Sequence, residues 1–255
     1  MQQVDTKKLN VLVNLMDVDS FVRNTGIHPL DNLYRKGRES HYFSVGYEAL
    51  WNVIQSMLGT GMTEPQYILD YPSGFGRVTR YLRAAFPDTE IHIGDTGSEA
   101  VDYCVDTYHA KNIDIIDWAK TTSTNQYDVI FSGTLLTHLP EEDGVKLLTM
   151  LSERLKINGL LIIACSGRKG LLDEQVHFNR EIFTSLENLV MLTRSYYNGH
   201  YAFINYPEQS GYGRSYIPLS WFHNYIQLHP HLSITRFAER GWDDNLDVIT
   251  IKRII

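Results

Sequence analysis

A glycine-containing turn offers the clearest chemistry in this 255-residue sequence. Residues 68–77 read Ile-Leu-Asp-Tyr-Pro-Ser-Gly-Phe-Gly-Arg, and Gly74 and Gly76 lie where an apolar run gives way to a helical pattern. Glycines let a backbone approach a ligand closely, and free N–H groups at the start of a helix attract anions. Asp95 follows Gly76 by nineteen residues, at the end of the next apolar run. A carboxylate there can accept both hydroxyls of a ribose, whereas the alternative is a tight turn beside a helix-capping acid.

Side chains that could act on a second substrate follow other apolar runs. His138 has a reference pKa near neutrality, which suits a general base, and the alternative is an exposed or capping histidine. Arg168 could bind an anionic group or merely a helix carboxylate. In the loop 239–244, Trp242 is a candidate platform for the substrate and Asp243 a candidate catalytic group; the alternative is that the acids of this loop only solvate a turn.

A tyrosine-rich segment, residues 167–215, separates the fifth apolar run from the next helical pattern. Phenols offer flat apolar faces with a hydroxyl group, which suits sugars and other polyols. We expect Tyr196, Tyr197 and Tyr201 to form a wall around the second substrate. A dimer surface and a small subsidiary core are the alternatives.

These residues need a scaffold in which strands alternate with helices. Short β-branched runs predict strands at Gln66–Tyr71, Glu90–Asp95, Asn112–Ile116, Tyr127–Gly133, Gly159–Cys165, Leu232–Glu239 and Leu246–Arg253. Apolar residues at helical spacing predict helices at Tyr42–Leu58, Gly76–Phe86, Thr96–Ala110, Glu141–Leu155 and Leu219–Leu228. The spacing of Thr96 and Glu99 predicts a capping box at the third of these helices.

Strands separated by helices pair in parallel through right-handed crossovers. The sequence therefore predicts an α/β fold with a doubly wound, mostly parallel seven-stranded sheet. The short loop before Leu246 makes the final two strands antiparallel, so the last strand is reversed. We expect residues 1–60 to be an N-terminal arm and helix that cover the ligand site, and residues 61–255 to form the main domain with its aromatic insertion at 167–215.

Composition narrows the classes of function. The chain has 30 acidic and 23 basic residues, a net charge of −7 and no long basic run, so nucleic acid is not an expected partner. The run Leu160–Cys165 is too short to span a bilayer and the first residues are not those of a signal peptide, so we expect no membrane insertion and a cytoplasmic location. Cys104 and Cys165 lack CxxC partners and the histidines form no ligand pattern, so no metal is predicted. The oligomeric state stays open.

The turn resembles the first motif of the class I S-adenosylmethionine-dependent methyltransferases. That motif is an acid followed by three alternating glycines, and here Asp70, Gly74 and Gly76 match it while Pro72 replaces the first glycine. The resemblance extends to the strand YDVIFSG with the TLLTHLP that follows it. It also includes the segment LKING before the fifth strand, which is similar to the family's Leu-Lys-Pro-Gly-Gly.

The resemblance implies the cofactor S-adenosyl-L-methionine and a Rossmann-like methyltransferase fold. It implies a ribose contact for Asp95 and an adenine contact for Asp117, although Asp117 could equally cap a helix. Tyr42 would cover the cofactor, with a packed aromatic as the alternative. The cofactor-binding residues expected on this basis are Tyr42, Asp70, Pro72, Gly74, Gly76, Asp95, Thr96, Asp117 and Ser132.

The arm His28–Tyr34 and the Glu-Arg-Gly-Trp-Asp loop further resemble bacterial methyltransferases associated with glycan assembly. This resemblance implies methyl transfer to a small-molecule or saccharide acceptor at a hydroxyl oxygen. One alternative is a nicotinamide-dependent dehydrogenase, whose G-x-G-x-x-G fingerprint would need a glycine at Thr79. The other is a regulatory module that binds S-adenosylmethionine without catalysis.

Overall fold

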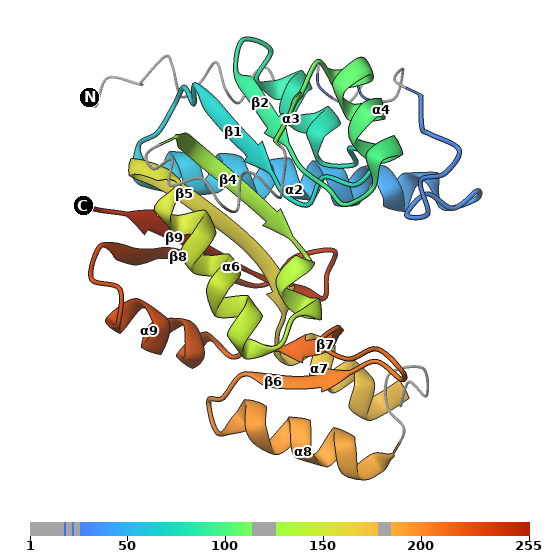
Figure 1. Cartoon of the computed structure of the whole chain (residues 1–255), viewed down its shortest axis with the longest axis vertical. Helices are drawn as coiled ribbons and strands as arrows, with labels where there is room; N and C mark the ends of the chain where they lie inside the picture. Colours follow the sequence, from blue (N-terminus) through green and yellow to red (C-terminus); the bar gives the residue numbers. More distant parts are fainter. Residues whose placement is uncertain (1–17, 19–21, 23–25, 114–125, 178–184) are drawn as a thin grey trace, which may run out of the picture. The chain divides into compact units, whose positions relative to one another are not determined.

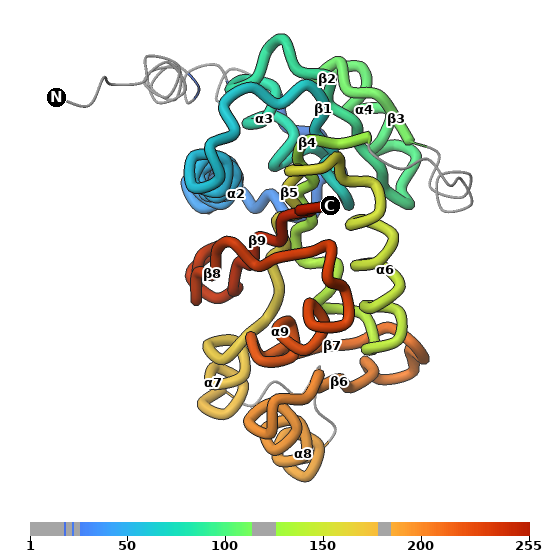
Figure 2. Tube along the Cα trace, turned by 90° about the vertical axis from the view of Figure 1, so that its left-hand side faces the viewer, coloured from blue at the N-terminus to red at the C-terminus, as the bar shows by residue number. Residues whose placement is uncertain are grey.

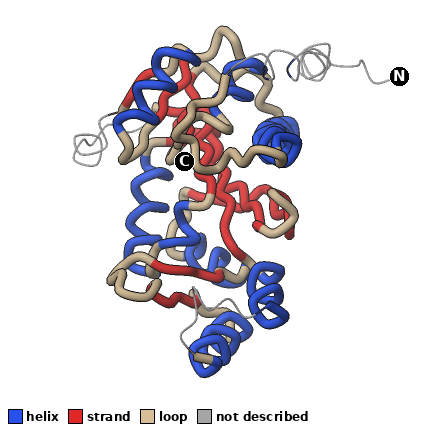
Figure 3. The backbone as a smooth tube through the Cα atoms, turned by 90° about the vertical axis from the view of Figure 1, so that its right-hand side faces the viewer, coloured by secondary structure: helices blue, strands red, loops and turns tan. Residues whose placement is uncertain are grey.

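The computed structural model describes residues 18, 22, 26–113, 126–177 and 185–255. Helices and strands alternate along these residues (Figure 1; Figure 3). The chain forms two compact units, Met1–Phe131 and Ser132–Ile255. Among the described residues, none of the helices is both long enough and apolar enough to span a membrane.

The first unit begins with a long amphipathic helix, α2 (Glu39–Thr60), which buries Leu50, Val53 and Ile54. Gly61 ends it with a φ of +80°, a conformation that glycine adopts without strain. The elements that follow are β1 (Tyr67–Asp70), α3 (Thr79–Ala85), β2 (Glu90–Ile93), α4 (Ser98–Tyr108), β3 (Lys111–Asn112) and β4 (Tyr127–Gly133). β1 pairs in parallel with β2 and with β4, and β2 pairs in parallel with β3.

The second unit contains a long strand, β5, whose antiparallel neighbour β9 also pairs with β8. Leu160 to Ile163 in β5 are fully or almost fully buried, as expected for a strand covered on both faces. Its elements are η1 (Leu135–His138), α6 (Glu141–Glu153), β5 (Leu155–Ser166), α7 (Arg168–His177), α8 (Leu186–Tyr197), β6 (Ala202–Asn205), β7 (Gly213–Tyr216), α9 (Leu219–Gln227), β8 (Leu232–Trp242) and β9 (Leu246–Arg253).

The strand order of the main sheet is β3-β2-β1-β4-β5-β9-β8. The last strand along the chain, β9, is the reversed one, since both of its neighbours pair with it in antiparallel register. The predicted fold class, an α/β fold with a mostly parallel seven-stranded sheet and a reversed last strand, is therefore confirmed.

The tyrosine-rich segment has secondary structure of its own. It contains α7, α8 and the antiparallel hairpin β6–β7 (Figure 2). A small hydrophobic core holds these elements together, made of Leu171, Leu189, Leu192, Tyr196, Ala202 and Tyr216. Burying each large side chain of this kind is worth about 1.5–3 kcal/mol. The subsidiary core that the sequence left as an alternative is thus present, and it includes Tyr196.

Three local predictions need correction. The capping box is wrong, because α4 begins at Ser98 with Gly97 as its N-cap and no side chain bonds there. The predicted helix from Gly76 begins only at Thr79, since the positive φ of Gly76 is not helical. The predicted loop from Arg240 is instead a bulged continuation of β8 to Trp242, where the strand pairs with Leu246.

Candidate functional site

The glycine turn follows β1 directly and is held by backbone hydrogen bonds. The N–H of Tyr71 donates to the Phe131 carbonyl, and the N–H of Ser73 donates to the Gly94 carbonyl at 3.1 Å. The Tyr71–Pro72 peptide is cis. Pro72 therefore stands in a turn at the position where the methyltransferase motif has its first glycine.

The two glycines of the turn have different surroundings. Both have a positive φ, +50° at Gly74 and +80° at Gly76. A Cβ at Gly76 would lie 2.5 Å from the Tyr108 ring and 3.0 Å from Cys104 Sγ, so this glycine is required by packing. A Cβ at Gly74 would meet nothing within 4 Å. Open space therefore lies on the side of Gly74 where a side chain would point, while its N–H donates to Asp95 and its carbonyl accepts from Cys104 Sγ.

Asp95 joins the turn to the start of α4. Its carboxylate accepts hydrogen bonds from the N–H of Gly74 at 2.8 Å and from the N–H of Gly97 at 3.2 Å. The helix-capping alternative is thus present in the geometry. Because the two oxygens of a carboxylate together accept about four hydrogen bonds, Asp95 keeps capacity for a ligand.

Asp70 lies under the turn, only 1% exposed, and accepts a 2.6 Å hydrogen bond from the hydroxyl of Thr79 at the start of α3. Burial raises the pKa of Asp70 to about 7, and the neighbouring Asp95 adds to the rise. Its position makes it a residue that fixes the turn against α3. Thr96, by contrast, is exposed.

The N-terminal arm contacts the turn from the other side. His28 stacks on Phe75 with ring centres 4.7 Å apart, and the Tyr103 hydroxyl donates to the Gly26 carbonyl. Tyr42 is 1% exposed and donates a 2.6 Å hydrogen bond to Asp31, so it is packed beneath the arm.

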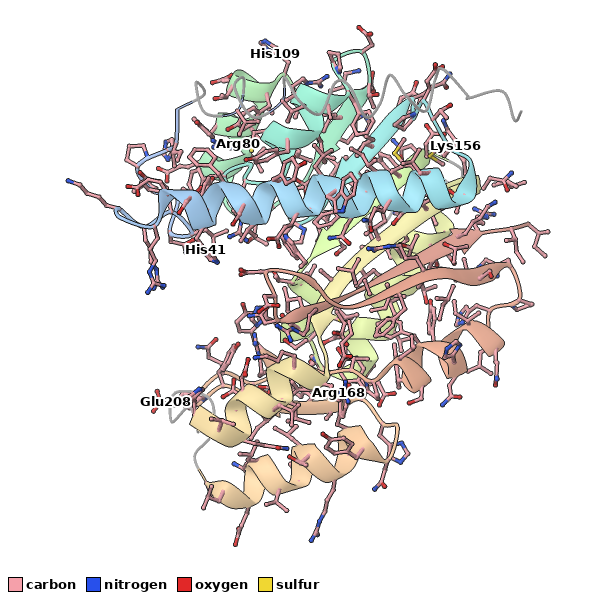
Figure 4. All side chains as sticks on the ribbon, turned by 180° about the vertical axis from the view of Figure 1, so that it is seen from behind. His41, Arg80, His109, Lys156, Arg168 and Glu208 are labelled. Atoms are coloured by element: carbon pink, nitrogen blue, oxygen red, sulfur yellow. The ribbon has the colours of Figure 1, made fainter. Side chains whose placement is uncertain are left out.

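A buried guanidinium lies beside Tyr42. Arg80 of α3, labelled in Figure 4, is fully buried, and its guanidinium carbon is 5.3 Å from the centre of the Tyr42 ring and 5.6 Å from that of Tyr108. Its hydrogen bonds to Gly26 and to Tyr42 are long, 3.4 Å each, and its Nη1 has no partner among the described residues. Positive charge is therefore concentrated under the arm.

In the second unit, His138 is the last residue of η1, and one of its ring nitrogens forms a hydrogen bond. Nδ1 lies 3.1 Å from the Gly213 carbonyl, which can only accept, so Nδ1 carries the proton. Burial lowers the pKa of His138, and Arg214 lowers it further. The neutral ring therefore keeps the lone pair on Nε2, the form that a general base needs.

Aromatic side chains from the hairpin surround His138. The Tyr206 hydroxyl lies 3.0 Å from Nδ1, and the Tyr212 ring stacks on the imidazole at 5.2 Å. Neither tyrosine was singled out by the sequence, although both lie in the predicted tyrosine-rich segment. The signal that could have found them is the hairpin pattern around the turn residues 207–211.

The structure gives other roles to most of the remaining candidates from the tyrosine-rich segment. Tyr201 is buried and its hydroxyl reaches the carbonyls of Leu136 and Leu139 at 3.0 and 2.9 Å, so it ties β6 to η1. Tyr197 is 57% exposed. Arg168, labelled in Figure 4, forms a bidentate ion pair with Glu239 at 2.7 and 2.9 Å, so its partner is a carboxylate of strand β8 and not the predicted helix carboxylate.

The candidates near the strand ends also differ in their surroundings. Trp242 is 3% exposed and so belongs to the end of β8, while Asp243 is partly buried with a φ of +53°. Ser132 is buried, and its hydroxyl lacks a partner among the described residues. Asp117 lies outside the described residues. No group of three His, Cys, Asp or Glu side chains within the described ranges could hold a metal ion.

Sequence reasoning missed one buried carboxylate, Asp247. It is 2% exposed at the start of β9, opposite Cys165 of β5, and it accepts a 3.0 Å hydrogen bond from the N–H of Arg240. Burial raises the pKa of Asp247 to about 6. An acid inside an otherwise apolar strand was the signal available.

Comparison with known proteins identifies solved structures that share this fold. No protein-family model and no protein of curated function matches the sequence. Among solved structures, the Burkholderia thailandensis 1,6-didemethyltoxoflavin-N1-methyltransferase, with 1,6-didemethyltoxoflavin and S-adenosylhomocysteine bound, matches with a TM-score of 0.55 at 11% identity, over 100% of this chain and 92% of that one. The chain has the class I methyltransferase fold.

Two further structures support this fold. A Clostridium acetobutylicum S-adenosylmethionine-dependent methyltransferase matches with a TM-score of 0.56 at 14% identity, over 81% of this chain and 91% of that one. The plantazolicin methyltransferase BpumL, in complex with a desmethyl substrate analogue and S-adenosylhomocysteine, matches with a TM-score of 0.54 at 14% identity, over 97% and 96% of the two chains. At identities this low, the structural similarity establishes a common fold only. Activity must be argued from the residues.

Proposed function

We propose that the chain is an S-adenosylmethionine-dependent methyltransferase that acts on a hydroxyl of a small molecule or saccharide. The observation that carries the proposal is the pair Gly74 and Asp95. The space where a side chain of Gly74 would point is open, and the N–H of Gly74 is fixed by a carboxylate that retains capacity for further hydrogen bonds. The likeness to solved methyltransferases supports the same choice.

The residues of the first unit fit the proposed cofactor. Gly74 would leave room for its amino-acid end, and Asp95 would accept hydrogen bonds from the hydroxyl groups of its ribose. Arg80 provides a positive charge under the arm, and its guanidinium donates to the hydroxyl of Tyr42, which in turn donates to Asp31. Asp70 and Thr79 keep the turn and α3 together. When bound, S-adenosylmethionine supplies a methyl group already activated on a sulfonium.

In the second unit, His138 is the proposed general base. Its Nε2 would accept the proton of the acceptor hydroxyl and so leave the oxygen able to act as a nucleophile. The Nδ1 hydrogen bond to Gly213 fixes the tautomer and the ring orientation that this transfer requires. The Tyr212 ring stacks on the imidazole and the Tyr206 hydroxyl lies beside Nδ1, so both contacts orient the ring.

Calorimetry with S-adenosylhomocysteine tests the cofactor site. Asp95→Ala removes charge-assisted hydrogen bonds worth about 1.5–3 kcal/mol each, so we expect affinity to fall tenfold or more. Asp102→Ala is the matched control, because Asp102 is an exposed acid on the neighbouring helix α4. Equal affinities of the wild type and the Asp95 variant would contradict the proposal. Tight binding of NAD, without binding of S-adenosylhomocysteine, would favour the dehydrogenase.

Turnover separates an enzyme from a regulatory module. The protein is incubated with methyl-labelled S-adenosylmethionine and a panel of phenols, hydroxy acids and saccharides, and label in the acceptor is measured by mass spectrometry. We expect transfer to at least one hydroxyl class, abolished by Asp95→Ala. Tight cofactor binding without transfer to any member of the panel would favour the non-catalytic module.

A further inference from the structure

Helix α8 lies at the edge of the second unit, and only one of its faces is covered. Leu189, Leu192 and Tyr196 of this helix belong to the small core of the tyrosine-rich segment. β6 and α7 lie on this inner side of α8, and no described element of the unit lies on the outer side (Figure 1; Figure 2). The outer face of the helix is therefore open to solvent.

The outer face of α8 carries large apolar side chains. Each of the following is at least 48% exposed: Leu186, Val190, Met191 and Tyr197. Because successive residues of a helix are rotated by about 100°, Val190 and Met191 lie on either side of the middle of this face, and Leu186 and Tyr197 lie along its edge on the side of Val190. Single exposed apolar residues are normal, but four on one helix face are typical of an interaction surface.

Two opposite charges lie on the same face. Glu187 and Arg194 are both exposed and seven residues apart, so they point in nearly the same direction but are separated by about 10 Å along the helix axis. They are too far apart to pair with each other, and neither forms an ion pair within the part of the chain that the structure describes. Their signs suit the helix dipole, which does not account for the apolar residues around them.

The positions of the two charges are self-complementary. The midpoint between Glu187 and Arg194 falls between Val190 and Met191, in the middle of the outer face. In an antiparallel packing of two α8 helices with a two-fold axis through this midpoint, Glu187 of each copy lies opposite Arg194 of the other. A parallel packing in register would instead oppose like charges. The charges therefore favour the antiparallel arrangement.

The apolar residues match under the same symmetry. Val190 of one copy lies beside Val190 of the second copy, and Met191 beside Met191, next to the two-fold axis. Leu186 of one copy comes within about 3 Å of the height of Tyr197 of the other, along the same edge of the face. One operation thus brings together all four exposed apolar side chains and both charges.

We propose that the outer face of α8 binds a second copy of this chain, with the two α8 helices antiparallel about a two-fold axis. The 12 residues of α8 make a helix about 18 Å long, so one face of it covers less than the about 800 Å² per partner of a standard interface. We therefore expect a weak dimer, with a dissociation constant in the micromolar range. The proposal is independent of the methyltransferase function, because it uses no residue of the glycine turn or of the His138 cluster.

Sedimentation velocity of the full chain, over concentrations from about 1 to 500 µM, measures this association. We expect the average mass to rise from that of one chain toward that of two. Glu187→Arg and Arg194→Glu each leave a single sign of charge on the outer face, so each variant alone should associate at least tenfold more weakly. In an equal mixture the two variants present opposite charges to each other. The mixture should therefore associate about as tightly as the wild type.

Met191→Glu tests the apolar centre of the contact. This variant places two carboxylates next to the two-fold axis, so we expect association to weaken at least tenfold. Leu228→Glu is the matched control, because Leu228 is 80% exposed in the same unit but follows α9, and it should dimerise as the wild type does. Thermal melting confirms that each variant is folded.

The proposal is overturned if the wild type stays monomeric over the whole concentration range, and the outer face of α8 would then be left for a different protein. It is also overturned if the dimer persists unchanged in Met191→Glu. A mixture of the two charge variants that associates no better than either variant alone would exclude the antiparallel pairing. Association that is lost in both charge variants and restored in their mixture supports the proposal, because parallel pairing in register does not predict this restoration.

Discussion

The glycine turn of the first unit and the His138 cluster of the second are built in different ways. The turn uses residues close together in the sequence and presents backbone atoms, fixed by Asp95 through two N–H groups. The His138 cluster uses side chains from η1 and from a hairpin 75 residues further along the chain. A ligand site made of backbone depends on local conformation, whereas a cluster of side chains depends on tertiary packing.

The two regions also differ in how many of their residues can be substituted. Any change at Gly76 or Asp95 alters the turn itself, since no other residue provides its φ angles or its carboxylate. The hairpin β6–β7 is stabilised by its own small core, so Tyr206, Tyr212 and Arg214 can vary while that core persists. Under the proposed function, the cofactor site would then be the less variable of the two and the acceptor site the more variable.

His138→Gln gives the largest expected effect and tests the side-chain cluster. Glutamine can keep a hydrogen bond to Gly213 but cannot take up a proton, so we expect turnover to fall about a hundredfold or more while cofactor affinity stays unchanged. For the wild type we expect turnover to rise with pH through a pKa below the ordinary value of histidine, because burial and Arg214 lower it. Unchanged turnover of His138→Gln would remove His138 from the mechanism.

Gly76→Ala and Gly74→Ala test the two glycines of the turn. Both variants strain a positive φ, at about 1 kcal/mol each, but only Gly76→Ala drives a methyl group into the Tyr108 ring. We expect Gly76→Ala to lose about 2–4 kcal/mol of unfolding free energy in urea titrations, and Gly74→Ala about 1 kcal/mol. Gly74→Ala should instead weaken S-adenosylhomocysteine binding. Equal losses of stability in the two variants would contradict the difference between a crowded Gly76 and an open Gly74.

The same contrast explains what the sequence could predict. The strands, the turn and Asp95 follow from local periodicity and spacing, because each depends on neighbours in the chain. The role of Tyr201 could not be predicted, since its hydrogen bonds reach Leu136 and Leu139, 65 and 62 residues away. The pairing of Arg168 with Glu239 likewise joins two elements whose proximity only the sheet order determines.

Tyr201→Phe tests whether a buried tyrosine of the tyrosine-rich segment stabilises the fold. The variant removes one hydroxyl that serves two carbonyls of the η1 region, so we expect a loss of about 1–2 kcal/mol of stability. Tyr197→Phe is the matched control, because that tyrosine is 57% exposed and should change stability by less than about 0.5 kcal/mol. If Tyr201→Phe kept full stability and lowered turnover, the predicted role of Tyr201 in the acceptor wall would be favoured over its structural role.

Asp247→Asn is expected to have the smallest effect, and its sign depends on pH. An unfolded aspartate ionises near pH 4, whereas burial raises the pKa of Asp247 to about 6 in the folded protein. The folded state therefore holds the proton more tightly. The stabilisation from protonated Asp247 is complete below about pH 4 and is lost as the pH rises through 6.

Asparagine cannot ionise and still offers an oxygen to the N–H of Arg240. We therefore expect Asp247→Asn to be more stable than the wild type by about 1 kcal/mol at pH 7.5 and equally stable near pH 4, measured by urea unfolding at both pH values. Asp244→Asn, an exposed acid in the same loop, should shift stability little at either pH. If Asp247→Asn were instead destabilised at pH 7.5, the charged carboxylate would be favourable where it lies. Asp247 would then join Asp95 as an acid that organises a turn, and the contrast between the two units would be smaller than their geometry indicates.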